Sequence, residues 1–150
     1  MPIVAKNKRA FFDYKILENF EAGLMLLGHE VKSIKAGHIS LKGSYVSFRG
    51  EELYLIGAHV TKYKQAGTML DYNATRERKI LLKKKEINHL IGKKKEGSLT
   101  LVPLKIYTKS SLIKIELALA EGKKKYDKRE DLKKKDIDRD MRTLTKRSNQ

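Results

Sequence analysis

The sequence lacks cysteine and tryptophan altogether, and it contains only two prolines among 150 residues. Without cysteine there is no disulfide framework, no thiol nucleophile and no cysteine-based zinc or iron–sulfur site. Long apolar runs are also missing. No window approaches the ~20 apolar residues needed to cross a bilayer, and the N-terminal residues do not read as a secretion signal. We therefore expect a protein of the cytoplasm.

Signatures of catalysis and of metal binding are equally scarce. The four histidines lie far apart along the chain and show no spacing of paired metal ligands. Asp136, Asp138 and Asp140 resemble the start of a calcium loop, but Met141 stands where that loop requires glycine. No nucleophile elbow and no phosphate-binding glycine loop occurs. We expect no enzyme activity, no metal and no cofactor.

Positive charge is what the chain has in excess. It carries 34 lysines and arginines against 18 aspartates and glutamates, a formal net charge of +16. A protein that neutralises phosphates gains free energy from released counterions, whatever the nucleotide sequence. Nucleic acid is therefore the first class of partner that the composition indicates, and an anionic membrane is the second.

Composition changes at residue 122, which we interpret as the boundary between a body and a tail. The body, residues 1–121, carries 22 basic and 12 acidic side chains and shows regular apolar patterning. Residues 122–150 carry 12 basic and 6 acidic side chains, with only five apolar ones. Five apolar residues cannot bury enough surface to offset the entropy of ordering. The sequence therefore predicts a basic tail that is disordered when free.

Helical spacing occurs twice in the body. A stripe of apolar residues at steps of three and four predicts a helix over 20–35, capped by Asn19 and ended by Gly37. A second, shorter helix is expected over 84–91, where Gly92 supplies the stop.

Elsewhere in the body apolar and polar residues alternate, which indicates strands with one face in a core. Pro103 interrupts one such run and indicates a sheet edge or a bulge. Residues 61–79 are expected to form mostly a long loop. Five or six strands with two helices suit a small antiparallel barrel, closed or nearly closed. The expected strands cover residues 10–17, 44–49, 53–60, 99–107 and 113–119.

Basic residues of the body form clusters suited to an RNA backbone. Arg76 and Arg78, one residue apart in an extended segment, should point the same way, and guanidinium groups grip phosphate or stack on bases. Two lysine runs, 83–85 and 93–95, flank the second helix and touch either RNA or only solvent. Some tyrosines offer stacking surfaces, although packing is the commoner role of each. They are Tyr14, Tyr45, Tyr63, Tyr72 and Tyr107.

The tail places one aromatic ring, Tyr126, between two basic clusters, an arrangement that can follow a phosphate backbone while the ring stacks on a base. Leu132, Ile137, Met141 and Leu144 form a weak helical stripe. A segment that folds on binding RNA and a disordered solubilising tail both fit this composition. A membrane-surface helix fits less well, because carboxylates interrupt the basic face. We expect no membrane partner.

Six short motifs follow one another along the chain. They are NKRA with DY at 7–14, FEAGL at 20–24, GHEVKSIKAG at 28–37, RERKILL at 76–82, PLKIY at 103–107 and GKKKYDKR at 122–129. These motifs, in this order, make the chain resemble the SsrA-binding protein (small protein B) family from one end to the other.

The resemblance implies an oligonucleotide-binding-fold barrel with flanking helices and no enzyme activity. It implies binding to the tRNA-like domain of transfer-messenger RNA and delivery of that RNA to stalled ribosomes, in trans-translation. By this resemblance Asn7, Tyr14, Glu21, Leu81 and Lys114 form or support the RNA-binding surface. Basic residues of the same motifs complete the expected interface: Lys8, Arg9, Lys32, Lys35, Arg76, Arg78 and Lys79.

For the tail, the resemblance implies a helix in the empty mRNA channel of the ribosome, with residues 127–129 near the decoding centre. Many relatives carry histidine at the position of Tyr126, and either ring can stack on a base. Elongation factor Tu is implied as an indirect partner through the charged RNA, and we expect a monomer. The expected decoding-centre residues are Gly122, Lys123, Lys124, Tyr126, Asp127, Lys128 and Arg129.

Alternatives remain open at this point. A carboxylate at position 21 suits the first turn of a helix. In an RNA interface Glu21 should instead accept hydrogen bonds from a base edge or hold a neighbouring cation. Leu81 fits a core as well as an interface. For the whole protein, a general RNA-binding or ribosomal protein is the main alternative, and an RNA-processing enzyme is disfavoured because no acid cluster or histidine pair is available for a metal.

Overall fold

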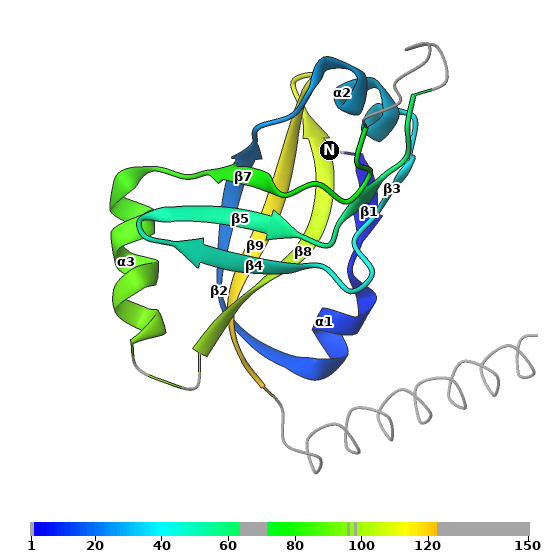
Figure 1. Cartoon of the computed structure of the whole chain (residues 1–150). Coiled ribbons are helices and arrows are strands. Elements are labelled where there is room, and N and C mark those ends of the chain that lie inside the picture. Colours follow the sequence, from blue (N-terminus) through cyan, green and yellow to red (C-terminus); the bar gives the residue numbers. More distant parts are fainter. Residues whose placement is uncertain (1, 64–71, 96, 98, 123–150) are drawn as a thin grey trace, which may run out of the picture.

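A seven-stranded antiparallel sheet dominates the computed structural model, which describes residues 2–63, 72–95, 97 and 99–122 (Figure 1). Its strand order is β1-β8-β9-β2-β7-β5-β4, and β3 pairs with β6 in a separate two-stranded ladder. The strands are β1 Ile3–Lys6, β2 Tyr14–Leu24, β3 Ile39–Ser40, β4 Tyr45–Arg49, β5 Glu52–Ile56, β6 His59–Val60, β7 Arg78–Leu81, β8 Leu99–Lys109 and β9 Leu112–Gly122.

Helices of the described residues are α1 (Lys8–Asp13), α2 (Gly28–Lys35) and α3 (Lys84–Lys94). In Figure 1, α2 lies at the top of the molecule, α1 at the bottom and α3 at the left. Within the described ranges, none of these helices has the length and apolar character needed to span a membrane.

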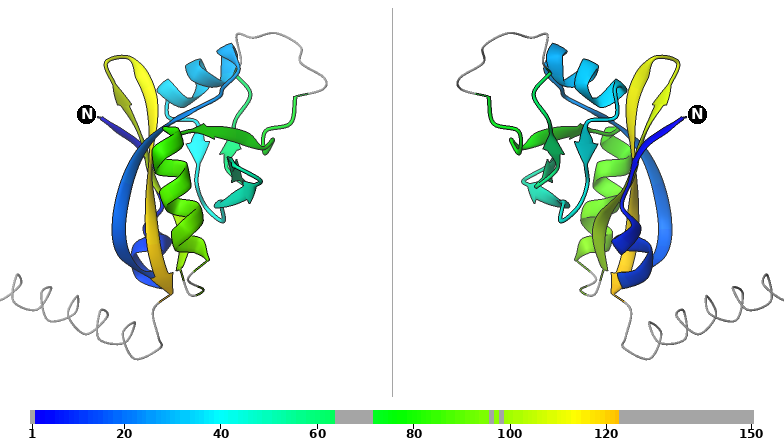
Figure 2. Two further views of the ribbon diagram at one scale, coloured as in Figure 1. Left: turned by 90° about the vertical axis from the view of Figure 1, so that its left-hand side faces the viewer. Right: turned by 90° about the vertical axis from the view of Figure 1, so that its right-hand side faces the viewer.

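The sheet curls into a barrel that resembles the oligonucleotide-binding fold. In the side views of Figure 2, the long strands β2, β8 and β9 form one wall, and β4 and β5 lie across from them. The curl brings β4 against β8, so the ends of the strand order approach each other. The predicted mainly β fold, a small antiparallel barrel with flanking helices, is therefore confirmed.

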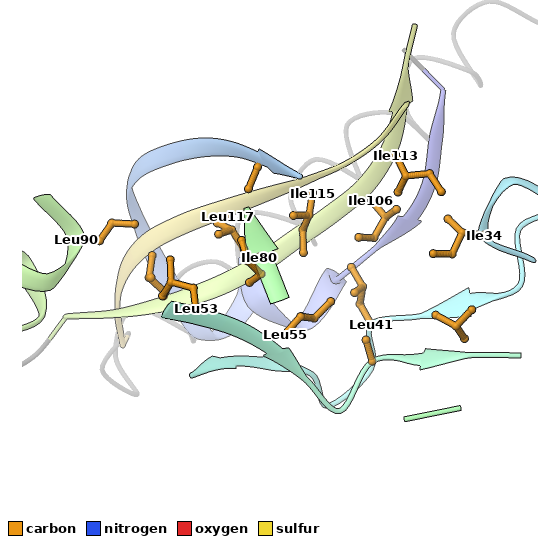
Figure 3. Close-up of a cluster of buried hydrophobic side chains, with 14 of the residues drawn as sticks. Ile34, Leu41, Leu53, Leu55, Ile80, Leu90, Ile106, Ile113, Ile115 and Leu117 are labelled. Atoms are coloured by element: carbon orange, nitrogen blue, oxygen red, sulfur yellow. The ribbon is translucent and has the colours of Figure 1, made fainter. Parts of the chain in front are cut away.

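The core fills the inside of this curled sheet (Figure 3). On β9, Ile113, Ile115 and Leu117 point inward, as the alternation in the sequence predicts. They meet residues of β5, β7 and β8, and the helices close the two ends with Ile34 of α2 and Leu90 of α3. Each large aliphatic side chain buried here contributes about 1.5–3 kcal/mol of transfer free energy.

A second, smaller cluster lies on the outside of the same wall. Ala10 of α1 packs there against Ala118 and Ala120 of β9, with Val102 and Leu104 of β8 beside them. Because alanine side chains are short, the helix can approach the sheet closely. Helix α1 covers one end of the outer face in this way, and the charged side chains of β2, β8 and β9 lie beyond it.

The predicted helix over 20–35 is wrong in its first part. Residues 20–24 belong to β2, where Phe20 pairs with Leu117 and Ala22 with Ile115. The apolar residues at 20, 22 and 24 also alternate with period two, and pairing with β9 decides in favour of the strand. Asn19 is therefore not a helix cap, and its side-chain amide donates to the Glu116 carboxylate at 2.8 Å.

The helix α2 that does form starts at Gly28, after the strand. Glu30 accepts a hydrogen bond from the Leu27 backbone N–H at 2.9 Å, which stabilises the first turn. The end predicted at Gly37 is confirmed, since this residue adopts a positive φ of 89° and donates its N–H to the Ile34 carbonyl.

Other boundaries differ from the predictions as well. The expected strand at 10–17 is helical through Asp13 and extended only from Tyr14 onward. Helix α3 continues through Gly92 to Lys94, so this glycine does not end it. The run at 53–60 forms two strands, β5 and β6, with a turn at Gly57 between them.

The segment 61–79 ends in a strand, not in a loop, because β7 begins at Arg78. Pro103 marks a bulge as predicted, since the register with β9 shifts between Pro103 and Lys105. It does not mark a sheet edge, because β8 lies between β1 and β9.

Candidate nucleic-acid interface

Four neighbouring strands place one row of residues across the open part of the outer face. Leu81 of β7 pairs with Gly23 of β2, Gly23 pairs with Lys114 of β9, and Lys114 pairs with Tyr107 of β8. Glu21 lies two residues before Gly23, on the same side of β2. We call these five residues the outer-face site.

Gly23 has no side chain, so the protein surface is lower in the middle of this row than at its two ends. A Cβ added at this position would lie 3.5 Å from the Leu81 Cβ, in ordinary van der Waals contact, so the glycine is compatible with a side chain but leaves the surface hollow. The resulting depression has a volume of about 510 Å³. Its lining consists of Glu21, Gly23, Leu81, Leu82, Lys83, Glu86 and Lys114.

Glu21 is held in place by its neighbours on β8. The Tyr107 hydroxyl donates to Glu21 Oε2 at 2.5 Å, and Lys109 Nζ lies 3.3 Å from Oε1. The hydrogen bond from Tyr107, with smaller help from Lys109 and Lys114, lowers the pKa of Glu21 despite some desolvation. Burial and the Glu21 carboxylate raise the pKa of Tyr107. Glu21 is thus an ionised hydrogen-bond acceptor whose orientation is fixed.

The structure decides between the alternatives that the sequence leaves open for Glu21 and for Leu81. Glu21 lies in a strand, so the prediction of a first helical turn is wrong. It does contact a neighbouring cation, Lys109, as expected of a carboxylate in an RNA interface. Leu81 is 45% exposed and is not a core residue. An exposed leucine beside a carboxylate and a lysine offers an apolar contact within a polar surface.

A second group of predicted residues lies beside α1, at the other end of the molecule. Asn7, Arg9 and Tyr14 line a depression of about 250 Å³ together with Tyr45, which is 54% exposed. Asn7 is also an anchor, because its backbone N–H donates to Leu104 and its side-chain amide to Pro103 of the β8 bulge. Arg9 pairs with Asp13 at 3.0 Å, and Lys8 is exposed.

Arg76 and Arg78 do point the same way, but they point at Glu30 of α2 and not at solvent. Both Glu30 oxygens lie 2.5 Å from a guanidinium nitrogen, one from each arginine. The Tyr72 hydroxyl also donates to Glu30, at 3.0 Å. We call these four residues the buried ionic cluster. Arg78 is 1% exposed, so it lies inside the protein and not on a surface that RNA can reach.

The cluster satisfies its buried charges almost completely. Arg78 donates to the carbonyls of Ala58, Arg76 and Ala74 as well as to Glu30. Burial alone would raise the pKa of Glu30, but hydrogen bonds from Arg76, from the Leu27 N–H and from Arg78 lower it to about 2. Glu30 is therefore a permanent buried anion at neutral pH.

The remaining basic residues of the predicted interface are dispersed. Lys32 and Lys35 are exposed on α2, with the Lys32 ammonium 5.9 Å from the Tyr63 ring centre. Lys79 pairs with Glu52 at 3.3 Å. Of the tail residues, Gly122 is the last residue of β9 and pairs with Tyr14. Lys123, Lys124, Tyr126, Asp127, Lys128 and Arg129 lie outside the described residues.

Sequence reasoning does not place Gly23 or Lys109 on this surface, although Gly23 lies inside the FEAGL motif. It names Tyr107, inside the PLKIY motif, only among the tyrosines that offer stacking surfaces, and the structure buries this ring and bonds its hydroxyl to Glu21. The importance of these three residues depends on strand pairing, because β2 and β8 are both neighbours of β9. In the described part of the chain, no group of three or more histidine, aspartate or glutamate side chains is placed to hold a metal ion.

Fold and surface together define a class of protein: a small antiparallel barrel of the oligonucleotide-binding type whose outer face combines carboxylate, lysine and leucine side chains, with a buried tyrosine bonded to the carboxylate. The chain belongs to the SmpB protein family, whose sequence model matches residues 4–147.

Relatives and a solved structure agree with this assignment. The SsrA-binding protein of Gloeothece citriformis is 48% identical over 145 residues, which cover 97% of this chain and 94% of the relative. That of Enterococcus faecalis is 48% identical over 143 residues, covering 95% and 92%. A chain of the solved structure described as "tmRNA-SmpB: a journey to the center of the bacterial ribosome" superposes with a TM-score of 0.64 at 45% identity, covering 80% of this chain and 84% of that one.

Proposed function

We propose that this protein binds the tRNA-like domain of transfer-messenger RNA and delivers it to stalled ribosomes for trans-translation. One observation carries the proposal: Glu21, Leu81 and Lys114, which family resemblance implies in RNA binding, meet on one exposed face although they come from three strands far apart in sequence. The relatives named after SsrA and the solved structure that combines tmRNA, SmpB and the ribosome support it.

The outer-face site supplies the chemistry that structured RNA requires. Proteins recognise such RNA by shape, by stacking on unpaired bases and by contacts to phosphates and 2′-hydroxyls. Lys114 supplies a cation for the backbone, Leu81 an apolar contact for a base or ribose, and Glu21 an acceptor for a base amino group. Tyr107 and Lys109 keep the Glu21 carboxylate oriented. The net charge of +16 attracts the RNA without sequence preference.

The tail completes the proposal. We assign the tail after Gly122, residues 123–150, to the empty mRNA channel, where the segment 127–129 lies near the decoding centre and Tyr126 stacks on a base. The protein acts without catalysis, as a monomer in the cytoplasm, and meets elongation factor Tu only through the charged RNA. The depression of Asn7, Arg9 and Tyr14 lies where β9 ends, so it belongs to the side of the barrel from which the tail departs.

A reconstituted tagging assay tests this function. Ribosomes stalled on an mRNA without a stop codon are supplied with charged transfer-messenger RNA and the full chain, and peptide tagging is measured. We expect tagging with the full chain. Deleting residues 123–150, which spares the β9 residue Gly122, should abolish tagging while reducing RNA affinity only modestly. Equal loss of both would contradict the division into a body and a tail. Absence of tagging with the full chain would contradict the function.

Tyr126→Ala examines the stacking contact within the tail. It should reduce tagging more than it reduces RNA affinity, because the ring is assigned to the ribosomal step. Tagging at the level of the unaltered chain would show that the ring makes no such contact.

A further inference from the structure

The depression of the outer-face site does not end at Leu81. The next residues along the chain, Leu82 and Lys83, also line it, and so does Glu86 in the first turn of α3. Lys83, the first lysine of the run 83–85, therefore lies in the turn between β7 and α3, at the edge of the site. Leu81 and Lys83 are two residues apart, at most about 7 Å between their Cα atoms.

The second lysine run lies at the other end of the same helix. Helix α3 has 11 residues, so a rise of 1.5 Å per residue separates the run 93–95 from Lys83 by about 15 Å. In Figure 1 the helix runs from the end of β7 down the left side of the molecule. The Lys94 ammonium lies 4.5 Å from the centre of the Phe48 ring, beside a different and smaller pocket. The two runs have the same composition and different surroundings.

The three lysines of the first run also differ in where they lie relative to the depression. Lys83, Lys84 and Lys85 are all exposed, but the lining of the depression includes Lys83 alone of the three. Lys83 and Lys114 contribute positive charge to this lining, and Glu21 and Glu86 contribute negative charge. Glu21 is already bonded to Tyr107 and Lys109. Glu86 therefore contributes the carboxylate that an incoming phosphate would meet beside Lys83.

Resting on the proposed RNA-binding function, we propose that Lys83 contacts a backbone phosphate of the RNA strand whose nucleotide packs on Leu81, and that Glu86 weakens this contact. A lysine ammonium is a compact charge that suits a single phosphate, and each phosphate neutralised releases condensed counterions. A carboxylate in the same depression repels the phosphate. The other lysines of the two runs contribute only to the general positive field.

Binding of the tRNA-like domain across a salt series tests the proposal in the full chain. Lys83→Ala should lower the affinity about fivefold to tenfold at 0.1 M salt and should reduce the slope of log K against log salt by about 0.7–0.9. Glu86→Gln should raise the affinity about twofold to fivefold, because a nearby repulsive charge is removed. Lys85→Ala and Lys95→Ala are matched controls that remove the same charge in the first turn of α3 and just after its last residue, and they should change the affinity less than twofold.

Three failures can be told apart. If the unaltered chain prefers the tRNA-like domain to an elongator tRNA and Lys83→Ala behaves like Lys85→Ala, the phosphate contact at Lys83 is wrong and the RNA-binding function stands. If Glu86→Gln weakens binding, the repulsive role of Glu86 is wrong. If the unaltered chain shows no preference between the two RNAs, both the function and the contact are overturned. Thermal unfolding of each variant checks that the fold is unchanged.

Discussion

Two glutamates of this protein have similar partners and opposite surroundings. Glu30 accepts hydrogen bonds from Tyr72 and from two arginines, and its side chain is 0% exposed. Glu21 accepts one from Tyr107 and contacts Lys109, and its side chain is 39% exposed. Buried charges are costly to leave unpaired, whereas exposed pairs are weakened by water and salt. The comparison indicates that Glu30 maintains the fold and that Glu21 remains accessible to a ligand.

The two regions are connected through β7. The buried ionic cluster joins α2 to the residues just before and at the start of this strand, Arg76 and Arg78. Leu81, at the other end of the same short strand, belongs to the outer-face site. The cluster therefore fixes the strand that presents Leu81 beside Gly23.

Removing the buried carboxylate should have the largest effect. Glu30→Gln leaves the Arg78 guanidinium buried without a counterion, which we expect to reduce the free energy of unfolding by about 3–5 kcal/mol. Glu52→Gln is a matched control, because Glu52 pairs with Lys79 at the surface, and should cost less than about 1 kcal/mol. Urea denaturation measures both. Equal losses would show that burial does not distinguish the two carboxylates.

Acid should also reveal how much the buried charge of Glu30 stabilises the fold. The pKa of Glu30 is about 2 in the folded protein against 4.5 as its reference value. Because the folded pKa is depressed, its contribution is fully present above about pH 4.5 and is lost as the pH falls toward 2. This contribution is on the order of 3 kcal/mol. Urea midpoints between pH 5 and 2 should fall less steeply for Glu30→Gln; parallel curves would contradict the assignment.

On the exposed face, Leu81→Ala should impair binding and spare stability. We expect a loss of about 1 kcal/mol in binding free energy to the tRNA-like domain, because the exposed part of the leucine side chain no longer packs on the nucleotide. Stability should change by less than about 0.5 kcal/mol, since the side chain lies on the surface. Leu112→Ala is the control, at a residue 60% exposed in the turn-side end of β9. If both variants bind alike, Leu81 is only a surface residue.

The smallest effect is expected from Tyr107→Phe. Loss of the hydroxyl removes the main cause of the lowered pKa of Glu21, so that pKa should rise toward 4.5. Stability should change by no more than about 1 kcal/mol, the usual net value of one hydrogen bond. NMR titration of the Glu21 side-chain carboxyl measures the shift. An unchanged pKa would show that the hydroxyl does not orient this carboxylate.

Much of the fold follows from local patterns in the sequence. Ile113, Ile115 and Leu117 alternate as a half-buried strand should, and they do form the core side of β9. The segment 20–35 is different, because its apolar residues satisfy a helical period and a strand period at once. The pairing of Phe20 and Ala22 with β9 decides in favour of the strand. This pairing joins residues about 95 positions apart, so it cannot be predicted from the local sequence.

The candidate site could also be predicted only in part, because it too depends on contacts between residues far apart in the sequence. Arg76 and Arg78 are the residue types that bind phosphate, but Glu30, more than 40 residues away, binds both of them, and Arg78 is fully buried. Tyr107 and Gly23 join the site only because β8 and β2 flank β9. Charge patterns identify candidate partners, whereas burial and strand order decide which charges are available to them.

The most direct test of the account is equilibrium binding of the full chain to the tRNA-like domain of transfer-messenger RNA and to an elongator tRNA across a salt series. We predict a strong preference for the first RNA that persists at salt concentrations that release the second, because a shaped surface around Glu21 and Leu81 adds to the charge. Equal affinities with equal salt slopes would mean that charge alone binds RNA, and would contradict the account.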